Sequence, residues 1–301
     1  MDYLASRYHV ETRRDPAALY PGLKSIIVVG MSYPLHANAQ LDNSSIGLIS
    51  GYATGIDYHV SIPRMLDPLV EFVIEIDPKA PLPRVFTDSA PIMERELAVR
   101  AGLGWIGKNS CLISPKHGSN ILLAEIFTGI ALETDQPFTA DRCGSCTRCI
   151  DACPTGCILP DRKIDASRCL SYHSIENKGE IPPALMDKFG PWIFGCDICQ
   201  MVCPWNTRRS NHPDTQNTIH LDINEMLEIL DYTPADFSTR FGTSAIARAR
   251  WKGLVRNIII RLANMRAVNA DGAIRKFTEL QVDPALQKTA SWALEQITKG
   301  P

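Results

Sequence analysis

The stretch Cys143-Gly-Ser-Cys146-Thr-Arg-Cys149-Ile-Asp-Ala-Cys153-Pro154 decides how the middle of this chain folds. Its spacing, Cys-x2-Cys-x2-Cys-x3-Cys-Pro, is the run with which bacterial ferredoxins hold iron–sulfur clusters. The two-residue gaps let three thiolates of one tight loop reach three corners of a cubane, while the fourth thiolate binds the other cluster of a two-cluster protein. The sequence therefore predicts an iron–sulfur domain with two 4Fe–4S clusters.

A second cysteine run supplies the partner that this spacing requires. It reads Cys196-Asp-Ile-Cys199-Gln-Met-Val-Cys203-Pro204 and contributes three thiols. One ligand is still needed, and Cys169 is the obvious candidate. The predicted ligand sets are Cys143, Cys146, Cys149 and Cys203 for one cluster, and Cys153, Cys169, Cys196 and Cys199 for the other.

Zinc is the main alternative for these thiols, because structural zinc sites also use Cys-x2-Cys pairs. Zinc does not require three cysteines at successive two-residue gaps followed by Cys-x3-Cys-Pro, so we favour iron–sulfur clusters. Nine of the ten cysteines fall between Cys143 and Cys203, which indicates metal in a reducing compartment rather than a disulfide scaffold. Cys111 and Cys157 are left over, and we expect both to be small buried apolar residues.

The composition is that of an ordinary globular protein. The chain has 301 residues, of which 45% are hydrophobic and 21% are charged, and its formal net charge is −2. A mostly disordered chain is excluded, and nucleic acid can be bound only through a local basic patch. We find no signal peptide, membrane-spanning stretch or coiled coil, and expect a cytoplasmic monomer without membrane contact.

Local patterns divide the chain into three expected domains: 1–135, 136–212 and 213–301. The first reads as α/β, with strands at 25–31 and 84–87 and a helix over 58–76 that Pro68 should kink or break. A second helix should begin at the Ser89 cap and run to about 101, and a hairpin should join 111–113 to 121–123.

The other two domains have different signatures. The segment 136–212 is rich in Cys, Pro and Gly, and metal bonds are expected to replace the hydrophobic core that it lacks. The last segment, 213–301, has apolar residues at helical spacing over 223–230, 254–265 and 290–297. We therefore expect a tail of antiparallel helices.

A glycine-rich segment allows two interpretations. Gly102, Gly104 and Gly107 surround Trp105 in a short stretch after the expected second helix. Glycines at this density let the backbone approach a flat ligand closely. The plainer interpretation is a tight connection. The glycines have the Gly-x-Gly-x-x-Gly spacing, but they follow an expected helix and not a strand, so a dinucleotide site is not supported.

Taken together, these motifs resemble the epoxyqueuosine reductase family, cobalamin-dependent iron–sulfur enzymes that complete queuosine in tRNA. The resemblance runs in order over nearly the whole chain. It rests on both cysteine runs and on the following segments: Tyr52 to His59, Asp88 to Glu94, Ala101 to Lys108, Ser171-Tyr172, Cys203 to Asn206 and Trp251 to Asn264. Family members usually carry a further segment before the equivalent of Met1, so an N-terminal part of the first domain is expected to be missing.

The resemblance implies an α/β cobalamin-binding domain like that of reductive dehalogenases, a two-cluster ferredoxin domain and HEAT-like C-terminal helices. It implies reduction of epoxyqueuosine to queuosine at the wobble position of tRNA. Electrons would pass from the two 4Fe–4S clusters to cobalamin, with an electron donor that the sequence does not identify. A related corrinoid reductase, such as a dehalogenase, and a non-catalytic electron carrier are the alternatives.

The resemblance also assigns residues. Asp88 matches the family's proton donor, although the same residue is also a candidate cap for the helix that follows. Cobalamin contacts are expected at these positions: Arg13, Gly51, Asp88, Leu112, Ile113, Ser171 and Tyr172. His59 is a possible cobalt ligand, but we prefer a satisfied polar residue near a helix start, with Asp57 as the helix cap.

The basic stretch from Ser244 to Arg266 is the candidate nucleic-acid surface. It holds six Lys and Arg residues and no acidic residue. A local stripe of this kind suits contact with the phosphate backbone, although most charge runs are solvated helix faces. The residues expected to contact tRNA are Arg248, Arg250, Lys252 and Arg256.

Overall fold

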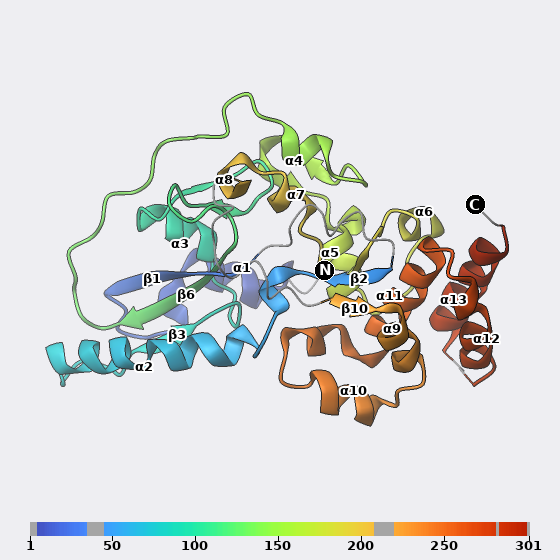
Figure 1. The fold of residues 1–301 in the computed structure, drawn as a ribbon. Coiled ribbons are helices and arrows are strands. Elements are labelled where there is room, and N and C mark those ends of the chain that lie inside the picture. The colour runs from blue at the N-terminus through green and yellow to red at the C-terminus, as the bar shows by residue number, and fades with distance from the viewer. Residues whose placement is uncertain (1–4, 35–44, 208–219, 281–282, 300–301) are drawn as a thin grey trace. The chain divides into compact units, whose positions relative to one another are not determined.

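The computed structural model describes residues 5–34, 45–207, 220–280 and 283–299 (Figure 1). The chain forms two compact units. Unit 1 consists of Met1–Tyr33 and Asp57–Cys146, and unit 2 consists of Pro34–Ile56 and Thr147–Pro301. The functional division at 1–135, 136–212 and 213–301 stays a prediction.

Unit 1 is built on a three-stranded antiparallel sheet. Its strands are β1 (Ser25–Ser32), β6 (Ile121–Thr128) and β3 (Arg84–Phe86), in the order β1-β6-β3. The apolar run at 25–31 and the stretch at 84–87 are thus confirmed as strands. The central strand β6 is buried from Leu123 to Thr128, so both faces of the sheet are covered there.

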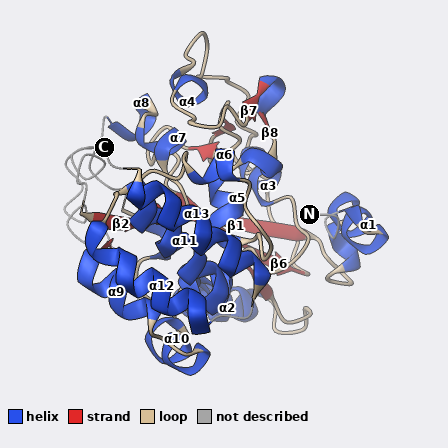
Figure 2. Cartoon of the chain, turned by 90° about the vertical axis from the view of Figure 1, so that its right-hand side faces the viewer, coloured by secondary structure: helices blue, strands red, loops and turns tan. Residues whose placement is uncertain are grey.

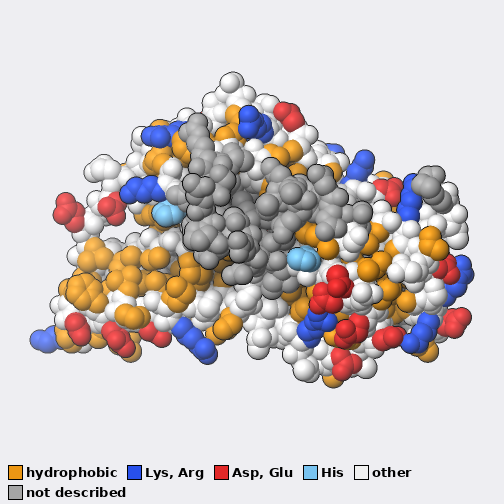
Figure 3. Space-filling model, viewed as in Figure 1, with side chains coloured by type: hydrophobic (Ala, Val, Ile, Leu, Met, Phe, Trp, Pro, Cys, Tyr) orange, Lys and Arg blue, Asp and Glu red, His pale blue; other side chains and the backbone are white. Residues whose placement is uncertain are grey.

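Helices cover this sheet. Helix α2 (Tyr58–Ile76) and helix α3 (Glu94–Arg100) both pack against β6, and Figure 1 shows them on opposite sides of it. A shorter helix, α1 (Arg7–Arg14), precedes the sheet. Asp57 caps α2 by accepting a hydrogen bond from the backbone N–H of His59, as expected. Apolar side chains gather over β1 and α2 in Figure 3.

The prediction that Pro68 breaks the helix over 58–76 is wrong. Helix α2 continues through both Pro63 and Pro68. Pro68 and Arg64, four residues earlier, are exposed, so water can satisfy the carbonyl that loses its partner. The apolar stripe of Tyr58, Ile62, Leu66 and Val73 is buried along the helix and stabilises it on both sides of the proline.

Two further local predictions are wrong. Helix α3 begins at Glu94 rather than near Ser89, because residues 87–93 form turns before it. The expected hairpin between 111–113 and 121–123 is not formed either. Strand β5 (Leu112–Ile113) pairs with β4 (Trp105–Ile106), because the Gly107 N–H donates to Cys111 O at 2.8 Å and closes a tighter turn.

Unit 2 brings together strands that are far apart in the sequence. Strand β2 (Ile46–Ile49) is parallel to β9 (Trp192–Phe194) and antiparallel to β10 (His220–Asp222). All four residues of β2 are buried, and its Leu48 packs with Trp192 and Met201 in one apolar cluster. This segment was expected in the first domain, but it completes the core of unit 2.

The cysteine-rich part of unit 2 consists of short elements. The helices are α4 (Arg148–Asp151), α5 (Leu170–Ile175), α6 (Pro183–Met186), α7 (Ile198–Met201) and α8 (Pro204–Thr207). Strands β7 (Ile158–Leu159) and β8 (Lys163–Ile164) form a two-residue ladder. Leu170, Met186 and Met201 of these helices are nevertheless buried in apolar clusters of unit 2, so the expectation that this segment lacks a hydrophobic core is wrong there.

The C-terminal region is helical, as predicted. It holds α9 (Ile223–Leu230), α10 (Pro234–Phe241), α11 (Arg250–Asn264), α12 (Asp271–Leu280) and α13 (Pro284–Thr298). Helix α11 is buried on all sides from Gly253 to Ala263, and α13 and α9 pack against it (Figure 2). None of the helices in the described ranges is both long and apolar enough to cross a bilayer.

Candidate active site and iron–sulfur ligands

Asp88 lies in the turn that follows strand β3. Its φ of 46° is left-handed, an uncommon conformation for a residue other than glycine, and 56% of its side chain is exposed. The Tyr58 hydroxyl donates a 2.8 Å hydrogen bond to Asp88 Oδ2. Since α3 begins only at Glu94, Asp88 is not a helix cap. Its carboxyl group is instead presented at the surface of unit 1.

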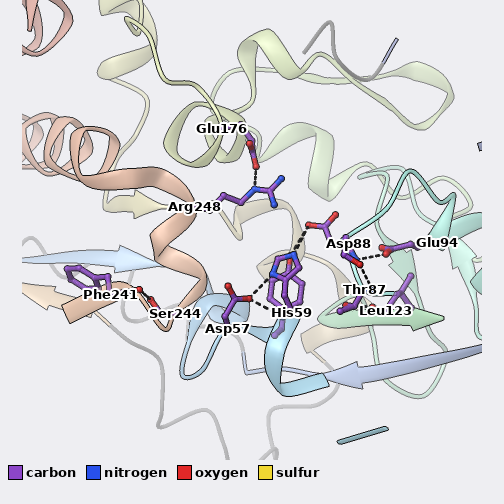
Figure 4. A network of polar contacts seen from close by, with 12 residues as sticks. Asp57, His59, Thr87, Asp88, Glu94, Leu123, Glu176, Phe241, Ser244 and Arg248 are labelled. Carbon is purple, nitrogen blue, oxygen red and sulfur yellow. Dashed lines mark hydrogen bonds and ion pairs between the residues drawn. The ribbon is translucent and has the colours of Figure 1, made fainter. Parts of the chain in front are cut away.

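His59 stands beside this carboxyl group (Figure 4). Its Nδ1 lies 2.7 Å from Asp57 Oδ1, and its Nε2 lies 3.9 Å from Asp88 Oδ2. The ring stacks on Tyr58 at a centroid distance of 4.1 Å. The expectation that His59 is a satisfied polar residue near a helix start is confirmed. Asp57, His59, Tyr58 and Asp88 form one polar network.

Two further carboxyl groups lie beneath the Asp88 turn. Glu94 Oε1 accepts the backbone N–H of Asp88 at 2.6 Å. Burial raises the pKa of Glu94 to about 7, although the Asp88 N–H acts in the opposite direction. Glu125, on β6, is fully buried, and burial together with the charge of Glu94 raises its pKa to about 9. Glu125 is therefore neutral at pH 7.

The glycine-rich segment is a tight connection. A Cβ on Gly104 would lie 2.0 Å from Ile113 O, and a Cβ on Gly107 would lie 2.4 Å from the Ile113 side chain. Close packing of β4 on β5 therefore accounts for both glycines, without a flat ligand. Gly102 has a φ of 76° and ends α3, where its N–H donates to Val99 O.

This hairpin also contacts the first cysteine loop within unit 1. Trp105 Nε1 donates to Cys143 Sγ at 3.4 Å. Lys108 Nζ donates to Gly144 O at 2.7 Å and to Cys146 O at 2.9 Å. A donor to sulfur stabilises thiolate charge, and the lysine fixes the loop that carries two of the predicted ligands.

In unit 2 the two cysteine runs fold alike. Cys149 lies in helix α4, and Cys153-Pro154 follows that helix directly. Cys199 lies in helix α7, and Cys203-Pro204 follows in the same way. The two short helices contact each other. This repeat is the arrangement that a two-cluster domain with exchanged fourth ligands requires.

Three predicted ligands of the second cluster lie near one another. Cys157 links two of them: its Sγ is 3.4 Å from Cys153 Sγ, and its hydrogen bond to Cys169 lowers the pKa of that thiol to about 6. Burial raises the pKa of Cys196, and the nearby Cys169 and Cys153 raise it further. Cys157 is 4% exposed, so the expectation of a buried thiol is confirmed, whereas Cys111 is only half-buried.

The surroundings of these sulfurs fit an iron–sulfur cluster. The backbone N–H groups of Ser171 and Tyr172 bond to Cys169, and that of Ile198 bonds to Cys196. Such N–H donors to sulfur are typical of cluster ligands. Among the described residues, no group of three His, Cys, Asp or Glu side chains converges on one point, as the ligands of a single metal ion do. A 4Fe–4S cubane does not require such convergence, because each of its irons binds one thiolate. The boundary between the units falls just after Cys146, so the first ligand set stays a prediction.

The predicted cobalamin contacts belong to both units. Arg13 is half-buried in the last turn of α1, and Leu112 and Ile113 form β5. In unit 2 the N–H of Gly51 donates to Asp197 Oδ2 at 2.8 Å, and the Ser50 hydroxyl donates to the same carboxylate. Ser171 and Tyr172 are half-buried and directly follow Cys169. These two residues fit a cofactor next to the second cluster, because their backbone already binds one of its ligands.

The basic stretch divides into exposed and buried residues. Arg248, Arg250 and Lys252 are exposed. Arg248 pairs with Glu176, and Lys252 Nζ lies 2.6 Å from Asp283. Arg256 is only 3% exposed, and its guanidinium donates to the carbonyls of residues 173, 177 and 179. The expectation that Arg256 contacts tRNA is therefore wrong, because helix α11 turns this side chain into the protein.

The supporting residues of these sites were not predicted. Tyr58 and Glu94 lie inside the motifs of the family resemblance, but a motif does not show which side chain contacts which. Lys108 lies in the glycine-rich segment, and Asp197 lies between two cysteines. Polar residues within such motifs are the signal that was available.

Comparison with known proteins agrees with this geometry. Residues 13–89 match a family model described as epoxyqueuosine reductase QueG, DUF1730, and residues 142–206 match a 4Fe-4S double cluster binding domain. An epoxyqueuosine reductase of Cyclobacterium marinum is 43% identical over 261 residues, which are 86% of this chain and 82% of that protein.

Solved structures are similar over almost the whole chain. One is an epoxyqueuosine reductase with a tRNA-Tyr epoxyqueuosine-modified tRNA stem loop, with a TM-score of 0.86 and 30% identity over 96% of this chain and 77% of that one. Another is the Bacillus subtilis enzyme with an aspartate-bearing catalytic loop swung out of the active site, with a TM-score of 0.83 and 30% identity at the same coverage. With its double-cluster domain and an aspartate on a turn beside the sheet, the chain belongs to the epoxyqueuosine reductase family of oxidoreductases.

Proposed function

We propose that this chain reduces epoxyqueuosine in tRNA to queuosine. The reaction takes two electrons and two protons, breaks the epoxide C–O bonds and releases the oxygen as water. Two 4Fe–4S clusters would deliver the electrons one at a time to a bound cobalamin, and an external reductant would refill them. The similar structure with an epoxyqueuosine-modified stem loop supports the choice of substrate.

The proposal includes a set of residues that would bind cobalamin. The candidates are Arg13, Gly51, Leu112, Ile113, Ser171 and Tyr172. When bound and reduced, a cobalamin supplies a cobalt centre that gives electrons to the epoxide carbon. Ser171 and Tyr172 would keep the cofactor next to the second cluster, since they follow Cys169 directly. Asp197 would act indirectly by fixing the backbone at Gly51.

The proposed proton donor is Asp88, because an epoxide oxygen leaves poorly unless it is protonated. The observation that carries this role is the polar network around the Asp88 carboxyl group. Tyr58 fixes Oδ2 from one side, and His59 stands 3.9 Å away.

His59 has a supporting role in this proposal. Asp57 holds its Nδ1, which leaves Nε2 directed toward Asp88. This places the ring where it can orient the Asp88 carboxyl group together with Tyr58. Because the Asp57 carboxylate is an acceptor, the ring nitrogen that donates to it is Nδ1.

Contact with tRNA is proposed for Arg248, Arg250 and Lys252. The acidic partners of Arg248 and Lys252 do not argue against it, because an exposed ion pair contributes only about 0–1 kcal/mol. Phosphate groups can replace those carboxylates at little cost. Release of counterions from the RNA would then drive the association.

The finer architecture belongs to the same proposal. The first domain would be a reductive-dehalogenase-like cobalamin domain spanning 1–135, followed by the two-cluster domain at 136–212 and HEAT-like helices at 213–301. Packing of α13 against both α11 and α12 supports the last assignment. We also propose a cytoplasmic monomer, since the thiols need a reducing compartment.

The test is turnover by the cobalamin- and cluster-loaded enzyme under anaerobic conditions, measured by mass spectrometry of nucleosides from epoxyqueuosine-containing tRNA. The unmodified chain should form queuosine, and Asp88→Asn should lower the rate by about 100-fold or more, since it removes a general acid. Asp67→Asn, an exposed aspartate on α2, is the matched control and should leave the rate unchanged.

Near-normal turnover by Asp88→Asn would remove Asp88 from the mechanism. No queuosine from the loaded, unmodified chain would overturn the proposed function. Dehalogenation of a small halogenated substrate by that same sample would then favour the related corrinoid reductase. A sample that never shows a corrin absorption band would instead favour the electron carrier.

A further inference from the structure

We propose that Glu94 is a positioning residue that holds the catalytic turn of Asp88 in place and releases it as the pH falls. The catalytic consequence rests on the proposed function, whereas the contact itself does not. Glu94 touches the backbone of Asp88 and not its carboxyl group, so it would act through the turn.

The turn needs such a support because its backbone is strained. Asp88 is one of only a few non-glycine residues in the described ranges with a left-handed φ, and this conformation persists only where neighbours enforce it. Before Asp88, the Thr87 hydroxyl anchors the strand end by donating to Leu123 O at 2.8 Å. At Asp88 itself, the N–H is held by Glu94 at 2.6 Å.

Glu94 is a firm anchor. It is the first residue of helix α3, which packs on β6 and β1 through the buried cluster of Ala98, Leu112 and Leu123. Its side chain is half-buried, so few alternative rotamers are open to it. The flexible element of the pair is the turn and not the glutamate. If this contact is lost, Tyr58 and His59 still contact the Asp88 side chain, but the backbone N–H of Asp88 loses this acceptor.

The charge of Glu94 decides how strongly it holds the turn. A carboxylate accepts an N–H more strongly than a protonated carboxyl group does. The pKa of about 7 means that both forms are populated near neutral pH, so the contact should tighten as the pH rises through about 7. Burial is the main cause of that value.

Several titratable groups face Glu94. Asp88 favours its protonated form, and Arg95 and His59 favour its ionised form. The fourth group is Glu125, whose own pKa is raised by the charge of Glu94. Strands β1, β4 and β5, which also pack on α3, contain no titratable residue. Because Glu125 stays protonated to about pH 9, it allows Glu94 to ionise without a second buried charge beside it.

The experiment is hydrogen–deuterium exchange of the full chain, followed by mass spectrometry of peptides that cover 86–93. In Glu94→Ala the Asp88 amide should exchange about 10- to 100-fold faster, which is the loss expected for a hydrogen bond to a charged acceptor. Glu94→Gln keeps a neutral acceptor and should restore part of the protection. Glu96→Ala, an exposed residue of the same first turn, is the matched control and should match the unmodified chain.

The pH dependence provides a readout that a purely structural role would not change. After correction for the intrinsic exchange rate, protection of the Asp88 amide in the unmodified chain should increase between pH 6 and pH 8. Glu94→Gln should show no such increase, and its turnover should lose the same pH dependence. Equal protection in Glu94→Ala and the unmodified chain would overturn the proposal, as would an unchanged pH dependence in Glu94→Gln.

The two proposals fail in different ways. If the loaded, unmodified chain makes no queuosine but Glu94→Ala loses protection, the contact stands and the proposed function falls. If that chain makes queuosine and Glu94→Ala keeps both protection and rate, the proposed function stands and the role of Glu94 falls. Should Glu94→Ala not fold, Glu94→Gln decides through its pH dependence.

Discussion

Replacing Arg256 with alanine should destabilise unit 2 while leaving RNA contact intact. Arg256 is 3% exposed, and its two terminal nitrogens donate to Asn177 O at 2.8 Å, to Gly179 O at 2.7 Å and to His173 O at 2.6 Å. Burial lowers the pKa of Arg256 to about 10, so the side chain is still charged at neutral pH. One cationic donor thus serves three carbonyl groups, of which that of His173 lies in a buried contact and those of Asn177 and Gly179 in partly buried ones.

The magnitude follows from these contacts. Arg256→Ala removes the charge together with its donors and leaves three neutral carbonyl groups without this partner, which costs about 1–3 kcal/mol. Summing the bonds separately would overestimate the effect, because the three carbonyls relax together. For a chain of this size the loss corresponds to a melting temperature lower by roughly 2–12 °C.

The assay pairs thermal unfolding, followed by circular dichroism, with binding of an anticodon stem loop over a series of salt concentrations. Arg256→Ala should lower the melting temperature and, below its transition, keep the salt dependence of the unmodified chain. The Arg248/Arg250/Lys252 triple alanine variant should keep its melting temperature, and the slope of log affinity against log salt should fall by about 2–3. Arg275→Ala, an exposed arginine of α12, should change neither quantity.

The reasoning is refuted by an unchanged melting temperature in Arg256→Ala. It is also refuted if that variant, while fully folded, loses RNA affinity to the same extent as the triple variant. The second result would mean that Arg256 reaches the RNA despite its burial.

The remaining predictions concern a buried carboxyl group and two thiols. The folded chain binds a proton on Glu125 up to about pH 9, whereas the unfolded chain releases it near 4.5, so stability should fall by about 1.4 kcal/mol for each pH unit between these values. Glu125→Gln should remove that slope in denaturant unfolding at pH 5 to 8, and parallel curves for the two proteins would contradict the assignment. Cys169→Ser should lose about half of the bound iron after anaerobic reconstitution, whereas Cys157→Ser should keep it, as measured by iron analysis and electron paramagnetic resonance. Loss of iron in Cys157→Ser together with retention in Cys169→Ser would make Cys157 the ligand.

Local patterns in the sequence were a good guide to elements whose stability is local. The apolar run at 25–31 is strand β1, and the helical spacing at 223–230 and 254–265 corresponds to α9 and α11. The thiol spacing predicted a double-cluster domain, which the family comparison confirms. In these cases periodicity or ligand spacing alone determines the structure.

Features that depend on distant residues were not predictable in this way. Strand β5 pairs with β4 and not with β6, because Gly107 allows a tighter turn. Residues 46–49 pair with a strand of unit 2 that is distant in the sequence. Helix α3 starts late because the Asp88 turn is held by Glu94, a contact that no propensity encodes. Arg256 and Arg250 look alike in the sequence, and only the packing of α11 separates them.

Strand β2 has a consequence for how the protein is made. Its residues Ile46–Ile49 leave the ribosome early, but their parallel neighbour is complete only when residue 194 has been synthesised. The nascent chain must therefore carry an unpaired apolar segment through most of translation, which exposes it to aggregation and makes late strand pairing a slow step. For the same reason, a truncated gene that begins after residue 56 should not yield a stable C-terminal half, because the missing strand lies at the centre of its sheet.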